Sequence, residues 1–239
     1  MAMRDAPLPE QRRRSSTHVL LASGDEVQLD LDEITLDDET GHHLARVLRL
    51  RDGEPVSVTD GAGRWRMTDF SSIGPLVVLT ASSAVTTEPP PSRFTLATAI
   101  PKGDRVDWLV QKTVELGADR IILLHAERST VRWKPERAAK QIVRLQRIAD
   151  EATRQSRRVW RTEVTGPAPV SDILDGATIA EPGGDAIRGD EAMIAVGPEG
   201  GWSADELERS ARSVRVGGNI LRIETAAVAV TTLRMVVDH

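Results

Sequence analysis

The sequence contains no cysteine among its 239 residues. Disulfide bonds, cysteine-based zinc sites, iron–sulfur clusters and thiol nucleophiles are therefore excluded. No apolar run approaches the ~20 residues that a membrane-spanning helix needs. The opening residues include Arg4, Asp5 and Glu10 and lack the apolar stretch of a secretory signal. These absences predict a cytoplasmic protein without a membrane partner.

Charge is unevenly distributed along the chain, although the formal net charge is only -5. From Ser16 to Pro90 there are 13 acidic and 5 basic residues, whereas from Arg132 to Arg161 there are 10 basic and 3 acidic residues. A local field of one sign can steer a polyanion to one face of an acidic protein. A solvated helix face explains the same run equally well, so both interpretations stay open.

Three consecutive prolines, Pro89 to Pro91, mark residues 86–92 as a stiff linker. Residues 1–15 show no periodicity and are expected to form a mobile tail. Residues 16–85 contain short runs rich in β-formers, one helix near residues 38–50 and a hairpin turn at residues 60–63. They predict a small β-barrel. The expected strands are 18–22, 55–59, 63–67 and 76–80.

After the linker, apolar strands alternate with helices, which predicts an α/β domain over residues 93–239 with a mainly parallel sheet. Asp104 is expected to cap the first of these helices, and Gly117 is expected to end it. The expected strands are 94–100, 121–124, 177–180, 192–196 and 214–216. The expected helices are 104–116, 135–158, 204–213 and 225–237.

A glycine-rich bend, Gly197-Pro198-Glu199-Gly200-Gly201, follows the strand at residues 192–196. It precedes a capping box that begins at Ser203 and opens a helix. A bend with so few side chains allows a ligand to approach the backbone closely. It matches neither the P-loop pattern nor G-x-G-x-x-G. A turn without a ligand is the commoner interpretation of such a bend.

A second bend begins at Gly217-Gly218 and leads into an apolar helix. Arg222 and Glu224 stand between apolar residues just before that helix. Charged residues in such positions either pair with each other or belong to a site. By residue type alone, a structural ion pair is the better interpretation.

The long helix predicted at residues 135–158 carries a basic stripe beside an apolar one. Arginine suits bidentate contacts with phosphate, so the basic stripe is a candidate for binding RNA. The histidine pair His42 and His43 has too few neighbouring ligands for a metal site, and packing or capping is the favoured role. The basic stripe consists of Arg137, Lys140, Arg144, Arg147, Arg154 and Arg158.

The two bends, followed by Ile220-Leu-Arg-Ile-Glu-Thr-Ala226, resemble the ribosomal RNA small subunit methyltransferase E family of knotted SPOUT methyltransferases. Further segments over about residues 16 to 237 resemble the family in the same order. They are Pro101-Lys-Gly-Asp104, Gln111-Lys-Thr-Val-Glu-Leu-Gly117, Glu127-Arg128-Ser129, Ala152-Thr-Arg-Gln-Ser-Arg-Arg158, His42-His-Leu-Ala-Arg-Val-Leu-Arg-Leu50 and Asp60-Gly-Ala-Gly63.

The resemblance implies a PUA-like barrel that binds RNA and a C-terminal trefoil-knot domain that binds S-adenosylmethionine and yields S-adenosylhomocysteine. It also implies a homodimer that methylates N3 of one uridine in 16S ribosomal RNA, free or in the assembled small ribosomal subunit. Two residues depart from the family pattern, Ile223 and Arg154, and their side-chain roles stay open. The cofactor-binding residues implied are Glu181, Pro182, Gly197, Pro198, Glu199, Gly200, Gly201, Val216, Gly217, Ile220, Leu221 and Thr225.

Loss of the uracil N3 proton spreads negative charge over the carbonyl oxygens, and a fixed guanidinium would stabilise it. We expect Arg222 to supply that guanidinium, with Arg128 as the alternative. Glu224 or Glu127 would orient the arginine or accept the proton. The RNA-binding residues expected are Arg144, Arg147, Arg154 and Arg158. The competing functions are methylation of transfer RNA by a related SPOUT enzyme and a non-catalytic RNA-binding assembly factor.

Overall fold

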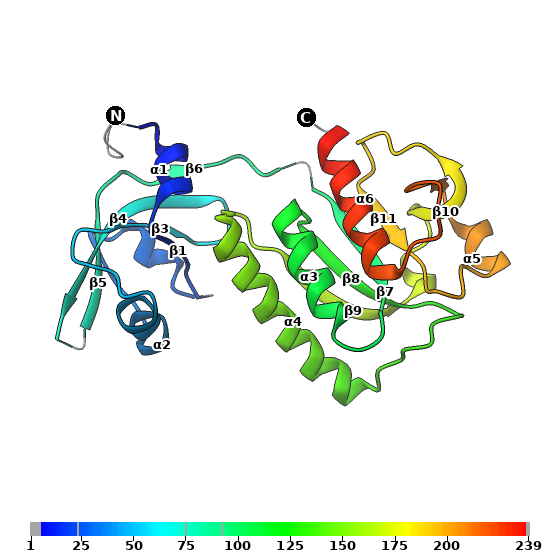
Figure 1. Ribbon diagram of the computed structural model, residues 1–239, viewed down its shortest axis with the longest axis horizontal. Coiled ribbons are helices and arrows are strands. Elements are labelled where there is room, and N and C mark those ends of the chain that lie inside the picture. The colour runs from blue at the N-terminus through cyan, green and yellow to red at the C-terminus, as the bar shows by residue number, and fades with distance from the viewer. Residues whose placement is uncertain (1–5, 23, 75, 92, 238–239) are drawn as a thin grey trace. The chain divides into compact units, whose positions relative to one another are not determined.

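The computed structural model describes residues 6–22, 24–74, 76–91 and 93–237. These residues form two compact units. The first unit comprises residues 1–90 together with 153–161, and the second comprises residues 91–152 together with 162–239. Figure 1 shows the helices and strands of both units along the chain. The second unit therefore differs from the predicted domain at residues 93–239 by the segment at residues 153–161.

The first unit is built around a six-stranded sheet in the order β1-β3-β4-β5-β2, with β6 beside β4. The pair β1–β3 is parallel, and the other pairs are antiparallel. The buried side chains of one face, among them Val56, Phe70 and Leu79, form its core. The elements are α1 (Leu8–Arg14), β1 (Thr17–Leu20), η2 (Glu26–Asp30), β2 (Glu33–Thr35), α2 (Asp38–His42), η3 (His43–Val47), β3 (Pro55–Thr59), β4 (Arg64–Ile73), β5 (Leu76–Ala81) and β6 (Thr86–Thr87).

The N-terminal segment differs from the expected tail, because residues 8–14 form the helix α1. Leu8 packs against a buried cluster that contains Trp65 and Val159. The guanidinium of Arg12 stacks on the ring of Trp65, 4.5 Å from its centroid. Residues 1–5 of the predicted tail lie outside the described residues. Arg12 also pairs with Glu88, and its carbonyl accepts a hydrogen bond from Arg157, at 3.0 Å, so contacts outside the helix hold α1 although it has no apolar periodicity.

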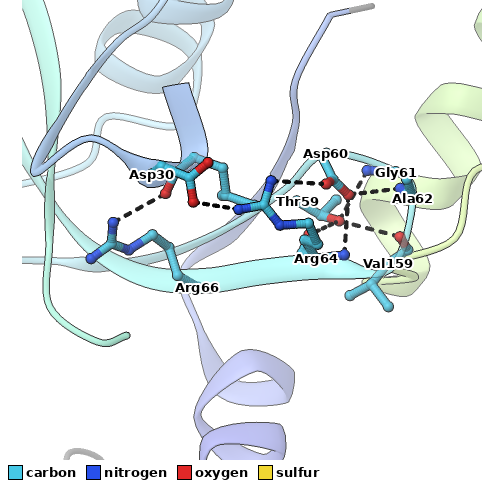
Figure 2. A network of polar contacts seen from close by, with 9 residues as sticks. Asp30, Thr59, Asp60, Gly61, Ala62, Arg64, Arg66 and Val159 are labelled. Atoms are coloured by element: carbon cyan, nitrogen blue, oxygen red, sulfur yellow. Dashed lines mark hydrogen bonds and ion pairs between the residues drawn. The ribbon is translucent and has the colours of Figure 1, made fainter. Parts of the chain in front are cut away.

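The turn between β3 and β4 has the hairpin geometry expected from its sequence (Figure 2). Asp60 Oδ1 accepts hydrogen bonds from the backbone N–H groups of Ala62, at 2.7 Å, and Arg64, at 3.1 Å. Beside the turn, the guanidinium of Arg64 pairs with Asp30. Arg66 donates to the carbonyls of Leu29, at 3.1 Å, Leu31, at 3.0 Å, and Ser83. Both arginines of β4 are therefore used to hold the first unit together.

Residues 153–161 join the first unit although the long helix α4 begins in the second. The backbone N–H of Gly63 donates to the carbonyl of Val159, at 2.9 Å, and the N–H of Arg161 donates to that of Gly61, at 2.8 Å. Val159 is buried beside Trp65. Helical periodicity shows which face of a helix is apolar, but it does not show which unit that face belongs to.

The second unit is an α/β sheet in the order β12-β10-β11-β7-β8-β9, and every pairing described in it is parallel. The elements are β7 (Thr95–Ala99), α3 (Arg105–Leu116), β8 (Arg120–His125), α4 (Pro135–Ser156), β9 (Glu163–Pro169), η4 (Val170–Asp172), β10 (Thr178–Asp185), β11 (Met193–Val196), α5 (Ala204–Arg209), β12 (Arg212–Val214) and α6 (Ile223–Val237). Strands β2, β6 and β9 were absent from the expected elements.

Both faces of the parallel sheet are covered. Along β8, Ile121 and Leu123 enter one core cluster with side chains of α3, α4 and α6, while Ile122 and Leu124 enter a second cluster. Burial on both faces explains why the strand is continuously apolar. Gly117 ends α3 at φ 117°, as predicted. Asp104 occupies the N-cap position of α3, but its side chain makes no capping hydrogen bond, contrary to expectation.

Candidate functional site

One cavity of about 330 Å³ lies at the carboxyl ends of three neighbouring strands in the second unit. Strand β10 lies between β12 and β11 in the sheet, so the segments that follow these strands meet at one edge. Both predicted bends contribute to the wall. Open α/β sheets commonly bind ligands at this edge, and the volume is within the range of small-molecule sites. The lining residues are Ala180, Glu181, Pro182, Val196, Gly197, Pro198, Glu199, Gly200, Gly201, Trp202, Val216, Gly217, Asn219, Ile220, Leu221, Ile223 and Ala226.

Strand β10 bulges where it reaches the cavity. Val214 of β12 pairs with Ala180 and again with Asp185, so residues 181–184 loop out between these two pairings. The guanidinium of Arg215 donates to the carbonyl of Gly184, at 3.0 Å. Bulges redirect side chains at the edges of sites. Here the bulge brings Glu181 and Pro182 into the cavity wall.

The first bend is a tight turn whose backbone lines the cavity. The N–H of Gly201 donates to the carbonyl of Pro198, at 2.8 Å, and Gly201 has φ 70°, in the left-handed region that favours glycine. A Cβ on Gly197 would lie 2.7 Å from Cε2 of Trp202. The indole of Trp202 therefore packs directly on Gly197, and its Nε1 donates to the carbonyl of Ala180, at 3.2 Å.

The capping box after this bend is present as predicted. The Ser203 side chain accepts from the N–H of Glu206, and Oε2 of Glu206 accepts from the N–H of Ser203, at 2.9 Å. The other carboxylate oxygen of Glu206 accepts from the N–H of Glu127, at 2.8 Å. One buried carboxylate thus fixes the start of α5 against residues 126–128. Glu127 itself is exposed.

Arg128 supports the first bend from outside. One guanidinium nitrogen donates to the carbonyls of Gly200, at 3.3 Å, and Trp202, at 3.1 Å. Arg128 is not among the cavity-lining residues. These contacts indicate a residue that holds the shape of the bend.

The second bend leads from β12 into α6 and forms the opposite wall. A Cβ on Gly217 would meet no atom within 4 Å, so a side chain there would extend into open space. Ile220 is 82% exposed although it lines the cavity. An apolar side chain left open at the edge of a cavity is available to a ligand that enters it.

Arg222 and Glu224 do not pair with each other. Glu224 is buried and faces Arg105 at the start of α3, with 3.5 Å between Arg105 Nη1 and Glu224 Oε1. The same nitrogen lies 3.9 Å from Oε1 of Glu199 in the first bend. Arg105 therefore faces carboxylates from both walls. It was missed in the sequence, where only its place directly after the family-like segment Pro101–Asp104 distinguished it.

The side chain of Arg222 is exposed, and it makes no hydrogen bond or ion pair with any described residue. Its neighbours Leu221 and Ile223 both line the cavity, whereas Arg222 does not. A guanidinium without a partner beside a cavity is available to a bound anion. The preferred sequence interpretation, an ion pair with Glu224, is wrong because Arg105 supplies the cation.

Glu181 is the acidic group of the cavity wall that burial affects. Removal from water raises the pKa of its carboxyl, because the charged form loses hydration. A carboxyl in this position can accept hydrogen bonds from hydroxyl or ammonium groups of a ligand.

Family models match both halves of the chain. A model described as an RNA methyltransferase domain matches residues 88–235, and one described as an RNA methyltransferase PUA domain matches residues 36–77. The chain is 31% identical to ribosomal RNA small subunit methyltransferase E of Mycobacterium tuberculosis (strain CDC 1551 / Oshkosh), over 80% of this chain and 82% of that one. It belongs to the ribosomal RNA small subunit methyltransferase E family.

Members and neighbours of this family share the fold across most of their length. The chain is 31% identical to the enzyme of that name from Neisseria gonorrhoeae, solved bound to S-adenosyl methionine, with a TM-score of 0.72 and coverage of 84% and 90% of the two chains. A methyltransferase from Legionella pneumophila has a TM-score of 0.76 at 24% identity, with coverage of 93% and 98%. The relative from Bacillus subtilis (strain 168) is 30% identical over 79% and 84%.

Most of the cofactor residues implied by the family resemblance line the cavity, namely Glu181, Pro182, the five residues of the first bend, Val216, Gly217, Ile220 and Leu221. Thr225 does not, and it is exposed in the first turn of α6. Six further residues line the cavity and were missed, namely Ala180, Val196, Trp202, Asn219, Ile223 and Ala226. Position next to a predicted bend was the signal that could have found them.

The four arginines expected to bind RNA have different surroundings in this family member. Arg144 pairs with Asp107 of α3, and a second bond, from Nη2 to Oδ1, is 2.8 Å long. Arg147 is exposed on α4. Arg154 is in the last turn of α4, within the first unit, and Arg158 follows the end of the helix at Ser156. Arg158 therefore does not belong to the helical stripe on which it was placed.

Histidines and metal ligands add little to the site. Across the described residues, no group of three or more His, Asp or Glu side chains is arranged to hold a metal ion. His42 and His43 are both exposed, so the expectation that they pack is wrong, whereas His43 does occupy the C-cap position of α2. No helix in the described part of the chain could span a membrane.

Proposed function

We propose that this protein transfers a methyl group from S-adenosylmethionine to N3 of one uridine in 16S ribosomal RNA. One observation supports this most: three neighbouring strand ends surround a cavity with glycine-rich walls, in a chain 31% identical to an enzyme solved with S-adenosyl methionine bound. The trefoil knot of the second unit is part of the same proposal.

The cavity suits S-adenosylmethionine in both size and chemistry. Its volume of about 330 Å³ falls in the small-molecule range. Backbone groups of residues 197–201 and 217–221 are accessible because few side chains cover them, and Glu181 offers an acceptor for hydroxyl or ammonium groups. Ile220 and Leu221 offer apolar contact. The bound cofactor supplies a methyl group on a positively charged sulfur, which is already electrophilic.

The remaining task of the protein is to favour the deprotonated form of uracil. Loss of the N3 proton places negative charge on the carbonyl oxygens, and a guanidinium held nearby lowers the cost. Arg222 has no partner among the described residues, whereas Arg128 is held by two carbonyls of the first bend. Arg222 is therefore the better candidate, and Arg128 supports the bend.

Glu224 is our candidate for receiving the N3 proton. Its Oε1 faces Arg105, while its Oε2 is buried without a hydrogen-bond partner among the described residues. A buried acceptor with a free lone pair is costly unless a ligand uses it. Orientation of Arg222, the other role considered for Glu224 or Glu127, has no contact in the structure to support it.

The protein partner proposed is a second copy of this chain. Helix α6 leaves Leu233, Val236 and Val237 exposed, at 38%, 66% and 50%. Exposed aliphatic residues grouped at one helix end suit an apolar interface. We place the protein in the cytoplasm with the small ribosomal subunit. Light scattering on the purified chain should give twice the monomer mass, and Val236→Glu should return it to that of the monomer.

Methylation is tested directly by incubating the purified chain with S-adenosylmethionine and either 16S RNA transcripts or small subunits, followed by mass spectrometry of nucleosides. The expected product is one 3-methyluridine per RNA. Ribosomal RNA from cells that lack the protein should miss the same methyl group. Binding of RNA without methyl transfer would favour a non-catalytic assembly factor, and methylation of transfer RNA alone would favour the other competing function.

A further inference from the structure

Residues 42–51 concentrate the positive charge of an otherwise acidic region. Between Ser16 and Pro90 there are only five basic residues, and Arg46, Arg49 and Arg51 are three of them. His42 and His43 precede them, and no acidic residue occurs from position 40 to position 51. A local positive field of this kind attracts a polyanion to one part of the surface.

The basic side chains of residues 42–51 are exposed and have no partner. The two histidines and the three arginines make no side-chain hydrogen bond or ion pair with any residue that the structure describes. Arg64 and Arg66 of the same unit behave differently, because Asp30 and backbone carbonyls bind their guanidinium groups (Figure 2). The three arginines of the segment therefore do not serve to hold the fold.

The backbone of the segment departs from ordinary helix geometry. Helix α2 continues into a π-helical turn at His43–Val47, a form that is rare and frequent at functional sites. Arg49 then adopts φ 56°, a left-handed conformation that is unfavourable for a non-glycine residue. The N–H of Leu50 donates to the carbonyl of Leu44, at 3.1 Å, and closes the turn. A strained turn is kept only where its surroundings fix it.

Two apolar side chains stand among these cations. Val47 is 59% exposed and Leu48 is 41% exposed, whereas Leu44 is buried in the core beneath them. Leu44 thus anchors the turn, and Val47 and Leu48 stay available. Arginine beside small exposed aliphatic surface suits the phosphates and the sugar and base faces of RNA.

We propose that residues 42–51 form the surface on which the first unit binds ribosomal RNA, with Arg46, Arg49 and Arg51 on phosphates and Val47 on sugar or base. This inference rests on the proposed function for the identity of the RNA. Residues 153–161 are the other arginine-rich segment of the unit. They are less suited to binding RNA, because Arg157 already donates to the carbonyls of Arg12, at 3.0 Å, and Ser15, at 2.6 Å.

The test compares two triple variants with the same loss of charge. The first is Arg46→Gln, Arg49→Gln and Arg51→Gln. The control is Arg13→Gln, Arg14→Gln and Arg120→Gln, which removes exposed arginines already paired with Glu10 and Glu163. Binding to a 16S RNA transcript is measured by filter retention from 50 to 300 mM KCl. Thermal melting checks folding.

The first variant should bind RNA about tenfold or more weakly at low salt, and its slope of log K against log salt should fall by about two to three. Its affinity for S-adenosylmethionine, measured by calorimetry, should not change. Val47→Ser should weaken binding by a smaller factor without altering the slope. An unchanged slope in the folded first variant, or an equal loss in the control, would overturn the proposal.

These readouts separate this proposal from the proposed function. If the unmodified chain binds the transcript and the first variant loses the salt slope, the RNA surface stands even where no methyl group is transferred. If methylation occurs and the variant retains both affinity and slope, the function stands and this surface is rejected.

Discussion

The indole of Trp202 occupies the space that a side chain at Gly197 would need, with 2.7 Å between a Cβ built on Gly197 and Cε2 of the ring. Both residues line the cavity, and the ring is also fixed by its hydrogen bond to the carbonyl of Ala180. The shape of the first bend therefore depends on the absence of one carbon atom.

Gly197→Ala should weaken the binding of S-adenosylmethionine about tenfold, because overpacking costs about 1–3 kcal/mol and here displaces Trp202. Calorimetric titration measures the change. Gly218→Ala is the matched control, since a Cβ there meets nothing within 4 Å and its φ is not positive. Equal affinities for the two variants would show that the ring moves without affecting the cavity.

Arg222→Ala and Arg128→Ala should fail in different ways. Loss of Arg222 should lower kcat about 100-fold to 1,000-fold with little change in cofactor affinity, because it removes charge stabilisation from the transition state. Loss of Arg128 should instead weaken cofactor binding about tenfold, because two hydrogen bonds that hold the bend disappear. Stopped-time methylation assays and calorimetry separate the two. Full activity in Arg222→Ala would remove that residue from the site.

Arg105→Gln should destabilise the second unit by about 1–2 kcal/mol, because it leaves the buried carboxylate of Glu224 without its cation. The double variant with Glu224→Gln should recover about 1 kcal/mol relative to the sum of the single changes. Urea unfolding gives the four free energies of the cycle. The exposed pair Arg120 and Glu163 is the control, and its coupling should be below about 0.5 kcal/mol. Equal coupling energies for the two pairs would contradict the assignment of Arg105 as the cation that stabilises buried Glu224.

His18 should make the first unit sensitive to acid. Burial, with the positive charges of nearby arginines, lowers the pKa of His18 from 6.5 to about 3. The folded state keeps the ring neutral, with Nδ1 2.7 Å from Ser57 Oγ and Nε2 3.0 Å from the carbonyl of Arg158. Below pH 6.5 protons bind the unfolded chain first, so the stability present above that pH is lost as pH falls toward 3.

The expected slope from His18 is about 1.4 kcal/mol per pH unit. It is best measured between pH 6 and pH 5, above the range in which most carboxyls titrate. His18→Gln should unfold with a correspondingly flatter pH dependence when denaturation is followed in urea at several pH values. Parallel curves for the two proteins would mean that His18 is protonated in the fold.

The sequence predicted β8 and β11 because they are buried on both faces and consist mainly of apolar residues. Strand β12 (Arg212–Val214) was instead expected at residues 214–216, and its first two residues were expected to be helical. The strand over Pro55–Thr59 was predicted with its observed ends. Strands β2, β6 and β9 were missed because two are very short and β9 contains a glycine and two prolines. Short or interrupted strands depend on their neighbours, which a single sequence does not display.

The parts of the site that depend on backbone shape were predictable, whereas the contacts between long side chains were not. Glycine and proline spacing placed both bends on the cavity wall. The partner of Glu224 was not predictable, because Arg105 is more than a hundred positions away and reaches Glu224 only through the packing of α3 against α6. The exposure of His42 and His43 was not predicted either, because the π-helical turn at His43–Val47 breaks the helical periodicity.

The membership of residues 153–161 in the first unit determines how the molecule can be divided. A fragment that ends near Pro90 would leave Trp65 and Met67 without Val159, their buried apolar neighbour. A fragment that begins after the prolines would carry Val159 and Trp160 with no core to enter. We therefore expect neither fragment to fold as it does in the whole chain, and an isolated first unit would need residues 153–161 joined to it by an artificial link.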